Sequence, residues 1–263
     1  MVNEKYHGLG TAPSVIRELF AYGLQQAKVV GKENVFDYSL GNPSIPAPAK
    51  VNETIKKLID TTDSIQLHGY SMAPGFENVR QAIADNLNAR FNCSAKASEL
   101  FMTCGCAPAL VSVAHALTTS PEDEFIAIAP FFPEYNVFFT CAGAKLAVVP
   151  ADTVHFQIDM DALEKTINEH SIAVVINSPN NPSGVVYTEE TLTKIAELLE
   201  RKSKEYGHPI YIVADEPYRE LVYDGVKVTF IPNVYDNTIV CYSWSKSLSL
   251  PGERIGYVYV PEK

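Results

Sequence analysis

The sequence alternates short, continuously apolar runs with longer segments in which apolar residues recur at helical spacing. Continuous apolar runs are typical of strands that helices cover on both faces. Strands are predicted at 100–103, 125–129, 145–150, 173–177, 210–215, 238–243 and 255–260. Helices are predicted at 14–27, 51–60, 75–90, 161–169 and 189–205. This order predicts an α/β fold, with a mixed, mostly parallel sheet sandwiched by helices.

A proline-rich stretch divides the chain near its beginning. Residues 39–50, SLGNPSIPAPAK, contain three prolines. Each proline fixes the backbone φ angle and removes an amide donor, so an extended connection is expected here. We predict an N-terminal segment over 1–48 and a larger domain over 49–263.

The composition excludes several classes of partner. The sequence has 21 Lys and Arg residues and 31 Asp and Glu residues, which gives a net charge of -10. This negative charge argues against nucleic acid or an anionic membrane as the main binding partner. There is no signal-peptide core and no apolar run long enough to span a bilayer. The five cysteines are interpreted as small buried residues of a reducing compartment, and the lone C-x-C at 104–106 predicts no metal site. We therefore expect a cytoplasmic protein.

Polar and aromatic residues follow the predicted strands. Ligands of such sheets lie beyond the carboxyl ends of the strands, so these residues are candidates for a site. The stretches are CGCAPAL after 103, PFFPEY after 129, SPNNPSG after 177, DEPY from 215 and SWSKSLSLPGERIG from 243. Lys246 and Arg254 are the two cations of the last stretch.

The strand-end residues resemble those of a known enzyme family. The order and spacing of seven of them are similar to the class I/II aminotransferases, fold-type I pyridoxal-phosphate enzymes like aspartate aminotransferase: Asn181, Asp215, Tyr218, Ser243, Ser245, Lys246 and Arg254. The resemblance covers essentially the whole chain, from LGNP to PGERIG. It implies pyridoxal 5′-phosphate as cofactor and transfer of an amino group from an L-amino acid to a 2-oxo acid through a Schiff base on Lys246.

A pyridoxal cofactor requires three kinds of group, and the sequence offers candidates for each. Lys246, at a strand-to-helix corner, is the amine and the proton carrier, because partial desolvation lowers a lysine pKa. Asp215 is the carboxylate that keeps the ring nitrogen protonated, because the attraction between the two charges is roughly 4 kcal/mol at a separation of about 4 Å. The side chain of Glu216 should point elsewhere. The expected phosphate donors are the Arg254 guanidinium, the hydroxyls of Ser243 and Ser245, and the amides of Cys106 and Ala107 after Gly105.

The resemblance assigns further roles. Asn181 and Tyr218 would hydrogen-bond the phenolic oxygen of the ring, and Phe132 would stack on its face, with a core position as the alternative. Tyr70 would reach the phosphate of a second subunit, which implies a homodimer with shared sites; a plain surface tyrosine is the alternative. The residues expected on the substrate side are Gly41, Asn42 and Asn181.

The chain departs from the family where it stops, at VPEK. Members of the family continue into a C-terminal small domain, so we expect a fragment: a segment over 1–48 that belongs with the small domain and substrate loop, the cofactor domain over 49–263, and no C-terminal small domain. Two alternatives to an aminotransferase stay open. One is a fold-type I lyase that performs β-elimination, such as a C–S lyase, and the other is a cofactor-binding fragment without turnover.

Overall fold

The computed structural model describes residues 1–39 and 41–262, which form two compact units, Met1–Ser44 and Ile45–Lys263. Leu40 and Lys263, which fall inside the predicted segments, lie outside the described residues. The first unit contains α1 (Glu4–Thr11), α2 (Val15–Val30) and η1 (Lys32–Asn34). Ser14 precedes α2, but its side chain makes no capping hydrogen bond.

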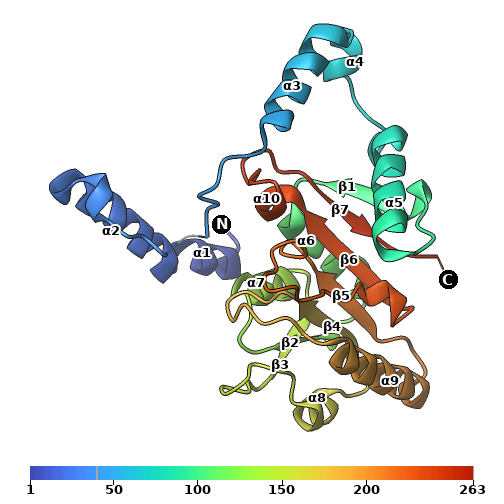
Figure 1. The fold of residues 1–263 in the computed structure, drawn as a ribbon. Helices are drawn as coiled ribbons and strands as arrows, with labels where there is room; N and C mark the ends of the chain where they lie inside the picture. The colour runs from blue at the N-terminus through green and yellow to red at the C-terminus, as the bar shows by residue number, and fades with distance from the viewer. Residues whose placement is uncertain (40, 263) are drawn as a thin grey trace. The chain divides into compact units, whose positions relative to one another are not determined.

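The second unit is built on a seven-stranded sheet (Figure 1). The strands are β1 (Leu100–Thr103), β2 (Glu124–Ile128), β3 (Lys145–Val149), β4 (Ser171–Asn177), β5 (Tyr211–Asp215), β6 (Thr238–Ser243) and β7 (Gly256–Tyr259). Their order is β1-β7-β6-β5-β4-β2-β3. β7 is antiparallel to both of its neighbours, and the other pairs are parallel. The mixed, mostly parallel sheet is thus confirmed.

Helices cover both faces of this sheet (Figure 1). Ile126 and Ile128 of β2 pack in a cluster with residues of α5 (Glu77–Phe91), α8 (Met160–Thr166) and α9 (Glu189–Tyr206). Phe125 and Ala127 of the same strand pack in a second cluster with α6 (Cys106–Leu117) and α7 (Glu134–Cys141). Successive strand residues point to opposite faces, so each strand contributes to both cores, and this explains its continuous apolar sequence.

The remaining short elements of this unit lie at its connections. They are α3 (Ala49–Thr61), α4 (Ser64–His68), η2 (Ala97–Glu99), η3 (Ile231–Asn233) and α10 (Trp244–Ser247). Thr188 caps α9, because its hydroxyl oxygen accepts a hydrogen bond from the backbone amide of Thr191 at 3.1 Å. In the described part of the chain, no helix combines the length and the apolar character needed to cross a membrane.

The antiparallel strand β7 determines where the functional residues gather. Gly256, its first residue, lies opposite Ser243 at the end of β6 and Thr103 at the end of β1. A Cβ on Gly256 would lie 2.5 Å from the Tyr242 carbonyl oxygen and 2.9 Å from the Gly105 carbonyl carbon. This glycine therefore lets the chain before β7, including Arg254, pass close to the start of α6.

Candidate active site

The carboxyl ends of the central strands open into a pocket of about 180 Å³, here named the strand-end pocket. The sequence-predicted residues that line it are Cys106, Ala107, Phe132, Asn181, Asp215, Tyr218, Ser243, Ser245, Lys246 and Arg254. Four further lining residues are absent from the prediction, namely Leu110, Asn177, Pro217 and Pro251. Candidates separated by up to about 150 positions thus converge on one cavity.

Lys246 projects from α10, a single turn that follows β6 directly. The side chain is half-buried, and burial lowers the pKa of its amine. This is the environment expected of a lysine that must act as a nucleophile, because the neutral amine is the reactive form.

Asp215 ends β5 and is 5% exposed. Tyr135 donates its hydroxyl proton to Oδ2 at 2.5 Å, and the Cys106 thiol donates to Oδ1 at 2.8 Å. Burial raises the pKa of Asp215, and these two hydrogen bonds lower it. Burial also raises the pKa of Cys106 and of Tyr135 well above their ordinary values, so both keep their protons and the Asp215 carboxyl remains the acceptor.

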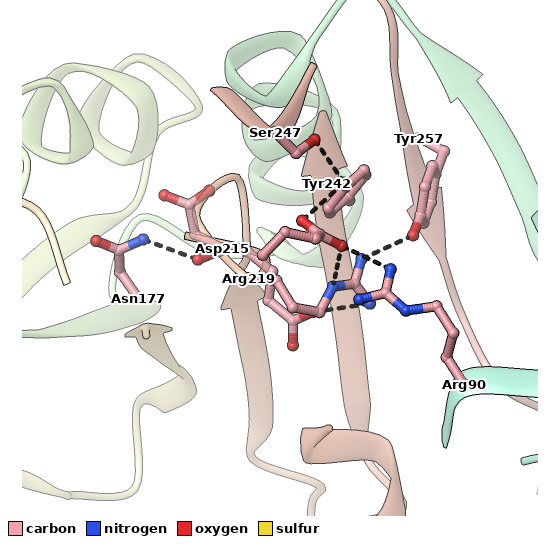
Figure 2. A network of polar contacts seen from close by, with 9 residues as sticks. Arg90, Asn177, Asp215, Arg219, Tyr242, Ser247 and Tyr257 are labelled. Carbon is pink, nitrogen blue, oxygen red and sulfur yellow. Dashed lines mark hydrogen bonds and ion pairs between the residues drawn. The ribbon is translucent and has the colours of Figure 1, made fainter. Parts of the chain in front are cut away.

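The side-chain amide of Asn177 connects the end of β4 to the end of β5. The Asn177 side chain donates to the backbone oxygen of Asp215 at 2.8 Å, as Figure 2 shows, and its Oδ1 accepts the amide of Asn181 at 2.6 Å. Nearby, burial raises the pKa of Tyr218 to about 12, and a hydrogen bond with the Asn181 side chain opposes this shift. The Tyr218 hydroxyl therefore keeps its proton at neutral pH.

Glu216 faces away from the strand-end pocket, as the sequence predicts. It is 2% exposed, and its Oε2 lies 3.3 Å from Nη1 of the buried Arg219. Figure 2 shows Arg219 beside Tyr242 and joined to the Tyr257 hydroxyl. Its guanidinium carbon lies 4.4 Å from the centre of the Tyr242 ring, and its Nη2 donates to the Tyr257 hydroxyl at 2.9 Å. The two adjacent carboxyl groups at the end of β5 thus serve opposite faces of the sheet.

Hydrogen-bond donors gather at the other end of the strand-end pocket. Gly105 precedes α6 with φ +98°, and a Cβ at this position would lie 2.6 Å from Nη2 of Arg254. The guanidinium therefore rests against the start of α6, and its Nη1 also donates to the Pro251 carbonyl at 3.0 Å. Ser243 donates to the Ser245 hydroxyl at 3.2 Å. A helix N-terminus, a guanidinium and two hydroxyls fit a phosphate dianion, so the donor set suits pyridoxal 5′-phosphate.

Some predicted residues lie outside this cluster. Tyr70, beyond α4, is fully exposed and does not line the strand-end pocket. Gly41 and Asn42 are exposed residues of the first unit, and their substrate role stays a prediction. The interpretation of all five cysteines as buried is wrong for three of them: Cys104, in the bend before α6, is exposed, and Cys93 and Cys141 are only partly buried.

Two contributors to the site escaped the sequence prediction. Tyr135 belongs to α7, an element that the helical periodicity did not indicate, although the aromatic stretch PFFPEY follows a strand end. Asn177 is the last residue of β4, and its polar character after AVVI was a usable signal. Among the described residues, no three His, Cys, Asp or Glu side chains are close enough together to hold a metal ion.

Comparison with known proteins places this geometry in a family. The chain is 31% identical over 250 residues to the probable N-acetyl-LL-diaminopimelate aminotransferase of Bacillus subtilis, covering 94% of this chain and 61% of that protein. A crystal structure of an aminotransferase from Eubacterium rectale matches with a TM-score of 0.97 and 61% identity, covering 100% of this chain and 66% of that one. The structure of Thermus thermophilus aspartate aminotransferase with maleate matches with a TM-score of 0.84 and 25% identity, covering 99% of this chain and 65% of that one.

The chain therefore spans a little under two thirds of the length of these relatives. The family model for class I and II aminotransferases matches residues 33–263. This chain belongs to the class I and II aminotransferases, whose aspartate aminotransferase-like members depend on pyridoxal 5′-phosphate.

Proposed function

We propose that this chain binds pyridoxal 5′-phosphate in the strand-end pocket and serves an enzyme that moves an amino group from an L-amino acid to a 2-oxo acid. The observation that carries the proposal is the convergence of three groups on one cavity. These are a half-buried lysine, a buried aspartate that accepts two hydrogen bonds, and an arginine lying against a helix N-terminus. Each matches one requirement of the cofactor: its aldehyde, its ring nitrogen and its phosphate.

When bound, the cofactor supplies an aldehyde that bonds an amine and a ring that accepts the electron pair released at the substrate Cα. The chain supplies the groups around it. Lys246 Nζ provides the first amine and, once displaced by substrate, takes the proton from Cα and returns it on the product side. Asp215 holds a proton on the ring nitrogen. Tyr218, Asn181 and Phe132 line the same pocket. The side chains of Tyr218 and Asn181 would bind the ring hydroxyl oxygen, and the ring of Phe132 would stack on the cofactor.

The phosphate end fixes the cofactor in place while the amines exchange. Arg254 supplies charge and directional donors, and the hydroxyls of Ser243 and Ser245 supply two more hydrogen bonds. The amides of Cys106 and Ala107, at the start of α6, complete the set. Because these donors are separate from Lys246, they would hold the phosphate when the lysine is displaced and so would preserve the orientation of the cofactor.

Chemical trapping tests the cofactor site. We expect the purified chain with added pyridoxal 5′-phosphate to develop a visible absorbance band, and borohydride followed by peptide mass mapping to place the reduced adduct on Lys246. Lys246→Ala should lose the band and the adduct, while Lys145→Ala, a surface lysine paired with Glu122, should keep both. An adduct spread over surface lysines with none on Lys246 contradicts the assignment.

Product analysis tests the reaction. With an amino acid and a 2-oxo acid as substrates, a new amino acid indicates transfer, whereas pyruvate and ammonia indicate a lyase. Positioned proton transfer typically contributes about 10²- to 10⁴-fold, and loss of the lysine also removes the covalent step. The Lys246→Ala variant should therefore retain less than about 1% of activity, and a higher residual rate would rule out the role of Lys246.

We further propose that the protein acts as a cytoplasmic homodimer with shared sites. The connection from α3 onward exposes large apolar side chains: Ile55, Leu58, Ile59, Ile65 and Met72. The three on α3 follow helical spacing and form one apolar face, which a second copy of the chain would cover. Tyr70 is fully exposed between Ile65 and Met72, a position from which it could serve a neighbouring subunit. All five cysteines are free thiols, which supports a reducing compartment.

A further inference from the structure

The carboxyl group of Asp215 has a donor from the protein on each of its two oxygens. Tyr135 of α7 donates to Oδ2, and Cys106, the first residue of α6, donates to Oδ1. All three side chains are buried, with exposed fractions of 5% for Asp215, 9% for Cys106 and 1% for Tyr135. Burial alone favours the neutral carboxylic acid, whereas hydrogen bonds donated to both oxygens favour the ionised form.

We propose that Cys106 is a positioning residue for the transfer reaction, which donates its thiol proton to Asp215 and so keeps that carboxylate ionised and turned toward the cofactor ring. This inference rests on the proposed function. A carboxylate oxygen has two lone pairs, so Oδ1 can accept the thiol proton and the ring N–H together. Cys106 and Asp215 both line the strand-end pocket, so the thiol holds the carboxylate at the wall that the ring faces.

The place of Cys106 in the chain couples the two ends of the cofactor site. It follows Gly105, where a Cβ would meet the Arg254 guanidinium, and its own thiol donates to Asp215. One helical turn therefore contacts both the phosphate-binding arginine and the carboxylate of the ring nitrogen. Titratable groups that interact electrostatically with Asp215 include Cys106, Tyr135, Cys241, Glu216 and Tyr218.

Cys241 provides a matched control within the same cluster. Its thiol is fully buried on β6 and interacts electrostatically with Asp215. In the part of the chain that the structure describes, however, its side chain donates no hydrogen bond to that carboxylate. A Cys241→Ala variant thus removes a buried thiol near Asp215 without removing a donor, which separates the hydrogen bond from the general effect of a small cavity.

The test compares Cys106→Ala, Cys106→Ser and Cys241→Ala in the full chain, with circular dichroism to verify that each folds. The first readout is the affinity for pyridoxal 5′-phosphate and for its 1-deaza analogue, which has carbon in place of the ring nitrogen. We expect Cys106→Ala to weaken cofactor binding roughly tenfold and analogue binding by less than about twofold. Cys106→Ser should restore affinity to within about threefold of the original, and Cys241→Ala should match the original for both compounds.

The second readout is the pH dependence of the absorbance of the bound cofactor. Without the thiol donor the pKa of the Asp215 carboxyl rises, so the carboxylate is a stronger base that holds the ring proton more strongly, and the ring proton should be lost about one pH unit higher in Cys106→Ala. Equal losses for cofactor and deaza analogue, or an unchanged pH midpoint, would overturn the role of Cys106. If the original chain forms no Lys246 adduct, the proposed function fails together with this inference. An intact adduct with an unaffected Cys106→Ala overturns the inference alone.

Discussion

At the residue scale, the site depends on one backbone position that tolerates no side chain. Gly105 has φ +98° and ψ 177°, a region of the backbone map that is essentially limited to glycine, and a Cβ there would displace the Arg254 guanidinium. We predict that Gly105→Ala lowers the free energy of unfolding by about 1–3 kcal/mol and weakens cofactor binding at least roughly tenfold, since one charged donor moves. Denaturant titration and cofactor titration measure the two effects.

Gly143 is the control for Gly105→Ala. Its φ of +99° is nearly identical, but a Cβ there would meet no atom within 4 Å. Gly143→Ala should therefore cost a similar backbone strain and leave cofactor binding unchanged. If both variants weaken cofactor binding equally, the effect arises from general destabilisation of the fold. The contact between Gly105 and Arg254 would then have no special part in phosphate binding.

The residues of the site differ in how far sequence could predict them. Lys246, Asp215 and Arg254 lie at strand ends or in a turn next to one, so the strand pattern together with the resemblance to the aminotransferases was enough to propose them. Tyr135 could not be found in this way, because its hydroxyl reaches Asp215 only through the packing of α7 on the sheet. Its bond to Asp215 spans 80 positions of the chain, which no local pattern encodes.

At the element scale, the turn that carries Lys246 is anchored from its opposite side. Trp244 packs edge-on against Tyr242 with ring centres 5.4 Å apart, and the Ser247 hydroxyl shares a 2.9 Å hydrogen bond with the Tyr242 hydroxyl (Figure 2). Tyr242 in turn donates to Glu220 at 2.9 Å. The residues at each end of α10 therefore contact this support, while Ser245 and Lys246 between them line the strand-end pocket.

Removal of the Tyr242 hydroxyl should loosen α10. We predict that Tyr242→Phe slows borohydride-trapped adduct formation on Lys246 by roughly 3- to 10-fold and lowers stability by about 1–2 kcal/mol, because it removes two buried hydrogen bonds, one of them to a charged group. Tyr257→Phe removes a hydrogen bond to Arg219 in the same network and keeps the ring that packs against Trp244 of α10. It should lower stability but leave the trapping rate unchanged, and equal slowing in both variants would contradict an anchoring role.

Element prediction succeeded where a pattern was long enough or buried enough to be distinctive. Each predicted strand lies within two residues of the observed one, because helices cover the sheet on both faces and make the strands continuously apolar. α10 has four residues, too few for a helical period, and α7 has only eight residues, about two turns. Both became helices through tertiary packing rather than through a local signal.

At the scale of the whole molecule, Tyr70 is the residue whose role depends on a second subunit. The chain's own strand-end pocket does not include it, and its side chain is fully exposed. If it donates a hydrogen bond to the phosphate in a partner's site, Tyr70→Phe should weaken cofactor binding by roughly 10- to 100-fold, the usual worth of a hydrogen bond to a charged group. A surface tyrosine without that role would give no change.

Mixed dimers separate a partner's contribution from a local one. Tyr70→Phe chains keep Lys246 and lack the hydroxyl, whereas Lys246→Ala chains keep the hydroxyl and lack the anchor. When the two are unfolded and refolded together, a hybrid dimer contains one site that combines Lys246 from one chain with Tyr70 from the other. The experiment uses a cofactor concentration at which the Tyr70→Phe chain alone gives no borohydride-trapped adduct. We predict that the mixture gives the adduct at this concentration and that the adduct is on the Tyr70→Phe chain. Trapping that stays absent from verified hybrids would mean that Tyr70 acts within its own chain or not at all.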